Sequence, residues 1–244
     1  MRIPRIFTPQ PLTVGLGLEL EPQASIHLGR VLRLQPGHPL VLFNGEGGEY
    51  SAQICSAGKK AVAVEILNYQ AVENESPLAT EICVGVSKGD KMDLIVQKCT
   101  ELGASCISPV ITERSDVKLN QERWEKKLSH WQQVAVSACE QCGRNRLPQI
   151  LPVRSFHDWL PQRQFSKAGI FHPGGNTSLP QVLSSSGEGI SLCFGSEGGF
   201  SDGEIQAAQA AGVTLVGLGP RVLRAETAPI AVLGALQTLW GDWR

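Results

Sequence analysis

The sequence predicts an α/β fold, a mostly parallel sheet with flanking helices, preceded by a small β-rich domain. From residue 81 onward, short apolar runs alternate with longer runs of helical period, which is the pattern of α/β domains. The first part of the chain instead contains short β-branched runs separated by turn residues. The polar segment 69–80 is broken by Pro77 and separates the two patterns. We therefore expect two domains, residues 1–72 and 73–244.

The N-terminal domain is expected to form a small barrel or sheet. Residues 39–55 contain two strand-like runs around an Asn44-Gly45 turn, and residues 61–67 supply a third run. These runs are rich in β-branched and aromatic residues, which favour a half-buried, pleated surface.

The second domain opens with a strand, a helix and another strand. Residues 81–87 and 106–111 have the composition of buried strands, and residues 90–103 between them have one apolar helical face before Gly103. Apolar residues then recur at the 3.6-residue period, which predicts a long amphipathic helix over 120–139. They are Trp124, Leu128, Trp131, Ala135 and Ala138. We expect both tryptophans to lie in the core.

The last third repeats the alternation. Three strand-like runs, 168–171, 190–195 and 213–218, each lead into a loop rich in glycine or proline. These loops read HPGG, SEGGFSDGEI and GPRVLRAETA. Ligands of parallel sheets bind at the carboxyl ends of the strands, which is where the three loops fall.

Local signals set the helices that follow two of these loops. Ser201 and Glu204 have the spacing of a capping box, so a helix should begin near Asp202 and end at Gly212. Pro229 fits the first turn of a final helix, where its missing N–H costs nothing.

The loops do not match the familiar nucleotide-binding motifs. A G-x-G-x-x-G fingerprint is absent, since Val222 stands where its last glycine would be, and there is no Walker A sequence. Glycine-rich loops can instead hold a ligand through main-chain N–H and C=O groups. An adenine edge suits such a site.

Composition excludes several other classes. A net charge of −1 argues against coating nucleic acid by bulk charge, although local basic clusters remain open. No segment is long and apolar enough to predict a membrane helix, and the prolines near the N-terminus do not suit a signal peptide, so we expect a cytoplasmic protein. Cys139 and Cys142 form a lone CxxC without further ligands, and we expect buried thiols and no metal.

Five blocks in order resemble a known family: KGDKMDLIVQKCTELGA, TERS, ACEQCGRNRLPQI, GSEGGFSDGEI and LGPRVLRAETA. Together they resemble the RsmE family, the S-adenosylmethionine-dependent 16S ribosomal RNA uridine-N3 methyltransferases of the SPOUT class. The resemblance implies a PUA-like N-terminal barrel in residues 1–72 and a trefoil-knot methyltransferase domain in residues 73–244. It also implies a homodimer.

In this class the methyl donor S-adenosylmethionine lies bent in the knot, with its adenine held by main-chain groups. The positions that carry over as donor-binding are Phe171, His172, Pro173, Gly174, Gly195, Ser196, Glu197, Gly198, Gly199, Leu218, Gly219, Arg221, Val222, Leu223 and Thr227. One departure is Ser196, where the family usually has proline. Serine gives a slightly looser turn and keeps an N–H donor.

Three residues are candidates for catalysis. Uracil N3 is a poor nucleophile while protonated, so a base must remove its proton or nearby cations must favour the deprotonated ring. We assign the electrostatic role to Arg224 or Arg114 and mainly an orienting role to Glu226, and leave the base unassigned. Structural roles stay open: Glu226 suits the N-terminus of the last helix, and Arg224 could pair with a carboxylate.

RNA contacts are expected from arginines in the N-terminal domain and beside the knot: Arg2, Arg5, Arg30, Arg33, Arg144 and Arg146, together with Arg114 beside the knot. The implied partner is 16S rRNA in the assembled small ribosomal subunit. Two alternatives remain: a SPOUT methyltransferase with another RNA target, and a non-catalytic RNA-binding assembly factor.

Overall fold

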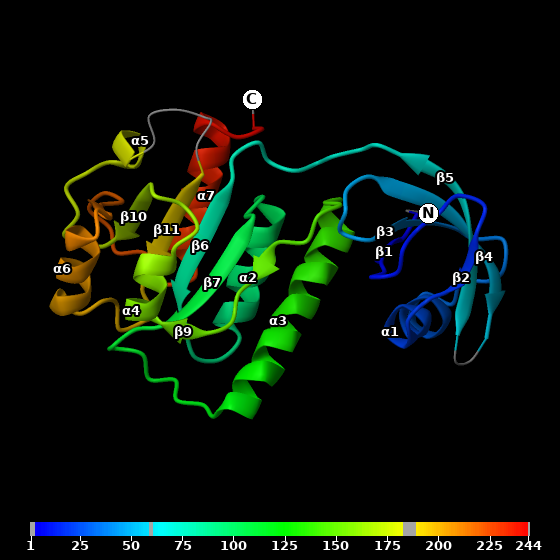
Figure 1. Ribbon diagram of the computed structural model, residues 1–244, viewed down its shortest axis with the longest axis horizontal. Coiled ribbons are helices and arrows are strands. Elements are labelled where there is room, and N and C mark those ends of the chain that lie inside the picture. Colours follow the sequence, from blue (N-terminus) through cyan, green and yellow to red (C-terminus); the bar gives the residue numbers. More distant parts are fainter. Residues whose placement is uncertain (1–2, 59–60, 183–188, 244) are drawn as a thin grey trace. The chain divides into compact units, whose positions relative to one another are not determined.

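The computed structural model describes residues 3–58, 61–182 and 189–243. Contacts divide the chain into two compact units (Figure 1). The first comprises Met1–Glu75 with Cys139–Leu147, and the second comprises Ser76–Ala138 with Pro148–Arg244. In the described part of the chain, no helix has the length and apolar character needed to cross a membrane.

The first unit contains a five-stranded sheet in the order β1-β3-β4-β5-β2. Strands β3, β4 and β5 form an antiparallel meander, β2 pairs antiparallel with β5, and β1 pairs parallel with β3. The strands are β1 Arg5–Phe7, β2 Gly17–Glu19, β3 Pro39–Phe43, β4 Glu49–Ala57 and β5 Val62–Gln70. The three strands predicted in 39–67 are confirmed, whereas β1 and β2 were too short to stand out.

Helix α1 (Pro22–Ile26) and the π-helix η1 (His27–Val31) follow β2 in this unit. The core beneath the sheet is aliphatic and includes Leu28, Leu42 and Ile54. Shortly after η1, Arg33 has a φ of 53°, which is uncommon for a residue with a side chain.

The second unit is built on a parallel sheet in the order β12-β10-β11-β6-β7-β8, with the short strand β9 also paired to β7. Its strands are β6 Thr80–Gly85, β7 Cys106–Ile111, β8 Gln149–Ile150, β9 Arg154–Ser155, β10 Ala168–Phe171, β11 Ile190–Phe194 and β12 Thr214–Val216. The four longer strands are those that the sequence predicts around 81–87, 106–111, 168–171 and 190–195. Because the strands are parallel, their carboxyl ends share one edge.

Helices cover both faces of this sheet (Figure 1). Alternate residues of the strands enter different cores: Ile82 and Val84 pack with one set of helices, and Cys83 packs with the other. The first set is α2 (Lys91–Glu101), α3 (Gln121–Cys142) and α7 (Thr227–Leu239), and the second is α4 (Phe156–Trp159) and α6 (Asp202–Ala210). The short helices η2 (Leu160–Gln162) and α5 (Leu179–Val182) complete the unit.

The apolar periods and caps account for these helices. Met92, Ile95 and Cys99 of α2 are buried as their spacing predicts. Trp131 of α3 is also fully buried, which confirms its place in the core. The mixed α/β unit with a parallel sheet, together with the small N-terminal β unit, confirms the predicted fold class.

A buried carboxylate fixes the end of the sheet opposite the loops. Glu81 at the start of β6 is fully buried, and its two oxygens accept four hydrogen bonds. The donors are the hydroxyls of Ser108 and Ser191, the Trp159 indole N–H and the Gln164 amide, at 2.5–2.9 Å. Such saturation is what a charge held away from water requires.

Candidate active site

The three predicted loops converge on one cavity in the second unit. They leave β10, β11 and β12 at the carboxyl edge of the sheet, which the neighbouring parallel registers bring together. The cavity has a volume of about 460 Å³, and the stacked rings of Phe171 and Phe194 form part of its wall, with centroids 4.6 Å apart. This volume lies within the range of small-molecule sites.

Close main-chain approach holds the first and third loops together. The His172 amide donates to the Val216 carbonyl at 3.0 Å, and Gly217 donates to Thr177 at 3.0 Å. A Cβ atom on Gly175 would lie 2.3 Å from the carbonyl carbon of Val216, so only glycine allows this contact. The two loops therefore form a single rigid wall.

The second loop is a tight turn that rests on neighbouring strand ends. Gly199 donates to the Ser196 carbonyl at 2.9 Å and has a φ of 68°, which favours glycine. The Ser196 hydroxyl lies 3.5 Å from that of Thr112, just after β7. A Cβ atom on Gly85, at the end of β6, would lie 2.4 Å from the Ser196 nitrogen. The turn is thus located by β6 and β7 as well as by β11.

Main-chain polar groups are available in the third loop. Between Leu218 and Leu223, no main-chain N–H or C=O has a hydrogen-bond partner among the residues that the structure describes. A second, smaller cavity of about 70 Å³ lies against this loop and shares Phe171, His172 and Leu223 with the first. A ligand in these cavities could satisfy the unpaired groups, which is the requirement for recognising an adenine edge through the main chain.

Charged side chains surround the larger cavity. Arg114 and Arg224 line it, and neither guanidinium has a hydrogen-bond or ion-pair partner within the described residues. Lys91, at the start of α2, donates to Glu197 at 2.8 Å. Burial raises the pKa of Glu197, but hydrogen bonds, led by that from Lys91, lower it more, so this pKa lies below its usual value. Glu197 is therefore ionised at neutral pH.

Glu226 also lines this cavity, and one of its carboxylate oxygens accepts no hydrogen bond from the described residues. It occupies the N-cap position of α7, but its side chain makes no cap hydrogen bond. Its Oε2 atom is shielded from water and has no partner among the described residues. A buried carboxylate oxygen without a donor is costly. The carboxylate is therefore suited to receive a hydrogen bond from a bound molecule.

The structure brings nearly all the predicted donor-binding and catalytic residues to the two cavities. Only Gly174 and Thr227 are not among the lining residues. Gly174 donates to the His172 ring, and Thr227 is exposed at the start of α7. Sequence reasoning missed Lys91. It follows the end of β6, so the rule that strand ends carry the site would have identified it.

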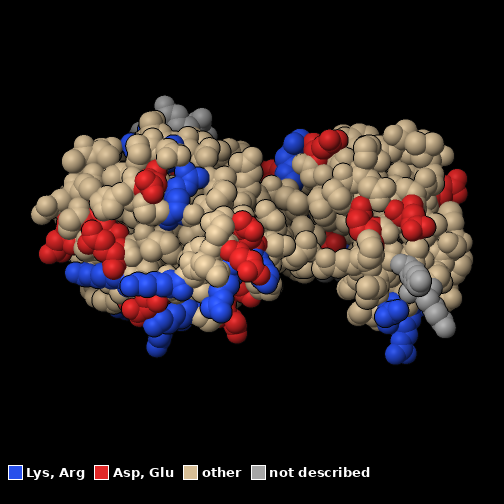
Figure 2. Space-filling view, turned by 60° about the horizontal axis from the view of Figure 1, so that its bottom comes forward, with Lys and Arg blue, Asp and Glu red and all other residues tan. Residues whose placement is uncertain are grey.

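The predicted RNA-binding arginines fall into different groups. Arg2 lies outside the described residues. Arg30 and Arg33 are exposed on the first unit, and Arg146 is exposed but forms an ion pair with Glu73 at 3.3 Å. On the face drawn in Figure 2, basic and acidic side chains are interspersed, in keeping with the net charge of −1.

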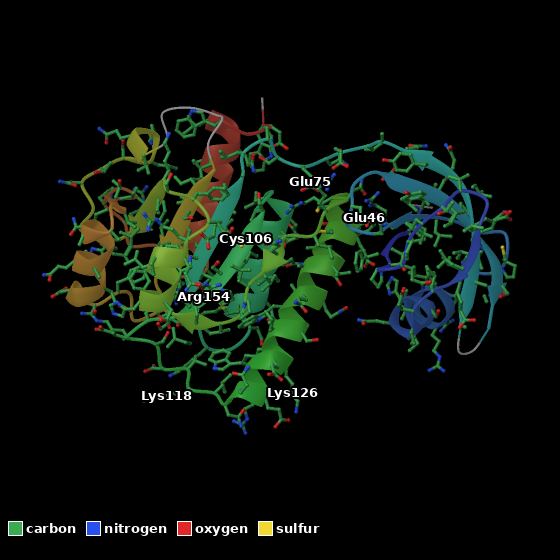
Figure 3. All side chains as sticks on the ribbon, in the orientation of Figure 1. Glu46, Glu75, Cys106, Lys118, Lys126 and Arg154 are labelled. Carbon is green, nitrogen blue, oxygen red and sulfur yellow. The ribbon has the colours of Figure 1, made fainter. Side chains whose placement is uncertain are left out.

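Two of these predictions need correction. Arg144 is only 5% exposed and forms an ion pair at 2.7 Å with Glu75, which follows β5 and is labelled in Figure 3. Arg5 is paired with Glu49 and donates to the Asn145 side chain at 2.6 Å. Both guanidiniums are committed to partners inside the first unit, so they hold the end of α3 to that unit rather than present charge to RNA.

The family comparisons agree with this geometry. Residues 74–237 match the family described as the RNA methyltransferase domain, and residues 20–67 match the RNA methyltransferase PUA domain. The ribosomal RNA small subunit methyltransferase E of Buchnera aphidicola from Acyrthosiphon pisum is 32% identical over 100% of this chain and 96% of its own length. The Bacillus subtilis protein of that name is 34% identical over 86% of this chain and 85% of its own.

The chain belongs to the ribosomal RNA small subunit methyltransferase E family. It is therefore an RNA methyltransferase by family. The resemblance read from the sequence blocks is confirmed.

Solved structures of high similarity support the same placement. A family member from Neisseria gonorrhoeae, crystallised bound to S-adenosyl methionine, is 37% identical, covers both chains completely and has a TM-score of 0.93. A protein from Legionella pneumophila, also solved with bound SAM, is 40% identical over 99% of this chain and 100% of its own, with a TM-score of 0.95. Within the described residues, no group of three or more His, Cys, Asp or Glu side chains could hold a metal ion.

Proposed function

We propose that the protein transfers the methyl group of S-adenosylmethionine to N3 of a specific uridine in the decoding region of 16S rRNA. The observation that carries the proposal is the cavity of about 460 Å³ where three strand-end loops meet, with two arginines at its wall whose guanidiniums have no partner in the described part of the chain. Family membership supplies the reaction class.

The fit of the donor rests on chemistry available in this chain. The unpaired main-chain groups of 218–223 can pair with the adenine edge, and the apolar wall of Phe171 and Phe194 can cover its ring. The loop 195–199 and the remaining predicted donor-binding residues close the other sides. The bound donor supplies an electrophilic methyl group on a sulfonium.

The protein's own groups then act on the uracil. Arg114 and Arg224 stabilise the negative charge that develops on the ring as N3 loses its proton. Glu226 accepts a hydrogen bond from a bound molecule and so orients it. Water takes up the N3 proton, and as the N3–C bond then forms, the C–S bond breaks and its electron pair stays on sulfur. The loops contribute mainly by holding the two reactants in line, an effect that can supply roughly 7–11 kcal/mol.

The RNA is proposed to contact the first unit through Arg30 and Arg33, with Arg146 available once its exposed pair with Glu73 opens. Exposed ion pairs are weak, so their exchange for phosphate is inexpensive. We further propose a homodimer acting in the cytoplasm on the assembled small ribosomal subunit, as the family resemblance implies.

The direct test uses small subunits from cells that lack the gene. Purified protein and S-adenosylmethionine should add one methyl group to one uridine of 16S rRNA, located at N3 by mass spectrometry of the digested RNA. Arg224→Ala should lower turnover about 10²-fold with donor affinity unchanged. Arg123→Ala removes an exposed charge from α3 outside the cavity and serves as the matched control. Methylation of another RNA, or donor binding without methyl transfer, would favour the two alternative functions instead.

A further inference from the structure

One buried carboxylate, that of Glu204, links the loop that carries Arg114 to the loop 195–200, which is called the donor loop below. Glu204 lies in the first turn of α6, directly after the loop 195–200, and is fully buried. One of its oxygens accepts from the Ser201 amide at 2.8 Å and completes the capping box. The other accepts from the Glu113 amide at 2.9 Å, although Glu113 is 91 residues away in the sequence.

The Glu113 amide belongs to the turn that presents Arg114. Ser115 donates to the Thr112 carbonyl at 2.9 Å, so residues 112–115 form a turn with Glu113 at its second position and Arg114 at its third. Arg114 lines the cavity and is exposed, so its own side chain does not fix this turn. The bond to Glu204 holds the turn at its second position, one residue before the guanidinium.

Further contacts also join the turn of Arg114 to the donor loop. A Cβ atom on Gly198 would lie 2.6 Å from the Arg114 carbonyl oxygen, so the donor loop packs directly on the backbone of Arg114. The Ser196 and Thr112 hydroxyls meet at 3.5 Å, and the Ser201 hydroxyl donates to the Glu113 carboxylate. The separation of Arg114 from the donor loop is therefore set by contacts that Glu204 anchors.

We propose that Glu204 is a positioning residue that sets Arg114 against the donor loop, so that donor binding and charge stabilisation share one rigid frame. The inference rests on the proposed methyl transfer. It assigns to Glu204 a function beyond capping α6. A capping box needs only one of the two carboxylate oxygens, and the second is directed to the loop of Arg114.

The hydrogen bond from the Glu113 amide to Glu204 can be removed while the buried carboxylate is kept. Glu113→Pro removes the amide donor at a turn position where proline is favoured. Glu113→Ala keeps that amide and removes the exposed carboxylate with its contacts to Ser201 and His157, which Glu113→Pro also removes, so it is the matched control. Turnover should fall at least tenfold in Glu113→Pro and less than twofold in Glu113→Ala, with donor affinity within twofold of wild type in both.

A double-mutant cycle distinguishes an effect of Glu204 on the position of Arg114 from a general disturbance of the fold. Glu204→Gln leaves one oxygen acceptor for two amides, so turnover should fall about tenfold when Arg114 is present and less than twofold in an Arg114→Ala background. Equal factors in both backgrounds, or wild-type turnover in Glu113→Pro, would overturn the proposal. An inactive wild-type protein would instead remove the proposed function. If Glu204→Gln does not fold, the proline and alanine pair at Glu113 decides the question.

Discussion

Replacing Gly85 with alanine should impair methyl transfer through the donor loop. Gly85 ends β6, and a Cβ atom there would lie 2.4 Å from the Ser196 nitrogen and 3.0 Å from the Gly195 carbonyl carbon. Ordinary contacts begin at 3.4 Å, so the loop must move by about 1 Å. The neighbouring atoms are backbone, and no flexible side chain can give way.

A displacement of about 1 Å in a reacting geometry can cost about 10²-fold in rate. We expect Gly85→Ala to lower turnover on small subunits by about that factor and to weaken S-adenosylmethionine binding in a calorimetric titration. Overpacking should also lower the free energy of unfolding by about 1–3 kcal/mol. Differential scanning calorimetry checks that the variant is folded at the assay temperature.

The matched control is Gly203→Ala, close in sequence to the same loop. A Cβ atom there would meet the Ser201 hydroxyl oxygen at an ordinary 3.7 Å, and alanine favours the helix α6. This variant should bind the donor as wild type does. Wild-type donor affinity and turnover in Gly85→Ala would refute the claim that the loop is held by backbone contact with β6.

Three other predictions concern stability and ionisation. Arg144→Ala should lower the free energy of unfolding by about 3 kcal/mol, because it strands the Glu75 carboxylate, and an unchanged guanidinium chloride midpoint would contradict this. Glu81→Gln should cost at least about 3 kcal/mol, since an amide cannot accept four hydrogen bonds; a loss below 1 kcal/mol in the same assay would count against the network. Lys91→Met should raise the pKa of Glu197, because burial then acts without its main opposing hydrogen bond, and an NMR titration showing no rise would disprove the pairing. In the wild type this pKa is depressed, so the pair's contribution to stability is complete above the unfolded pKa and is lost as the pH falls through the folded one.

Local signals explain why much of the fold could be predicted. The strand at 106–111 and the helix beginning at Asp202 follow from apolar runs and a capping box, which depend on neighbouring residues alone. The convergence of the three loops follows from a rule about parallel strand ends. The trefoil knot is expected only from the family resemblance, because topology rules alone would have rejected it.

Long-range pairing set the limit of sequence reasoning. The sequence around Arg144 predicts an exposed arginine that could contact RNA. The side chain is instead buried by its pairing with Glu75, which lies 69 residues away in the sequence. The second bond of Glu204 likewise reaches 91 residues back to Glu113, although its capping role was evident locally. Neither partner can be read from spacing, periodicity or composition. Charged residues whose partners lie far along the chain are those for which the sequence alone assigns the wrong role.

The central claim is that three strand-end loops bind one methyl donor through their main chain. A crystal structure of the protein grown with S-adenosylmethionine tests it most directly. The account predicts density for the donor in the cavity, with adenine contacts to main-chain atoms of 218–223 and further contacts to the loops at 172 and 195–199. Density for the donor at any other place, or contact with only one of these loops, would contradict it.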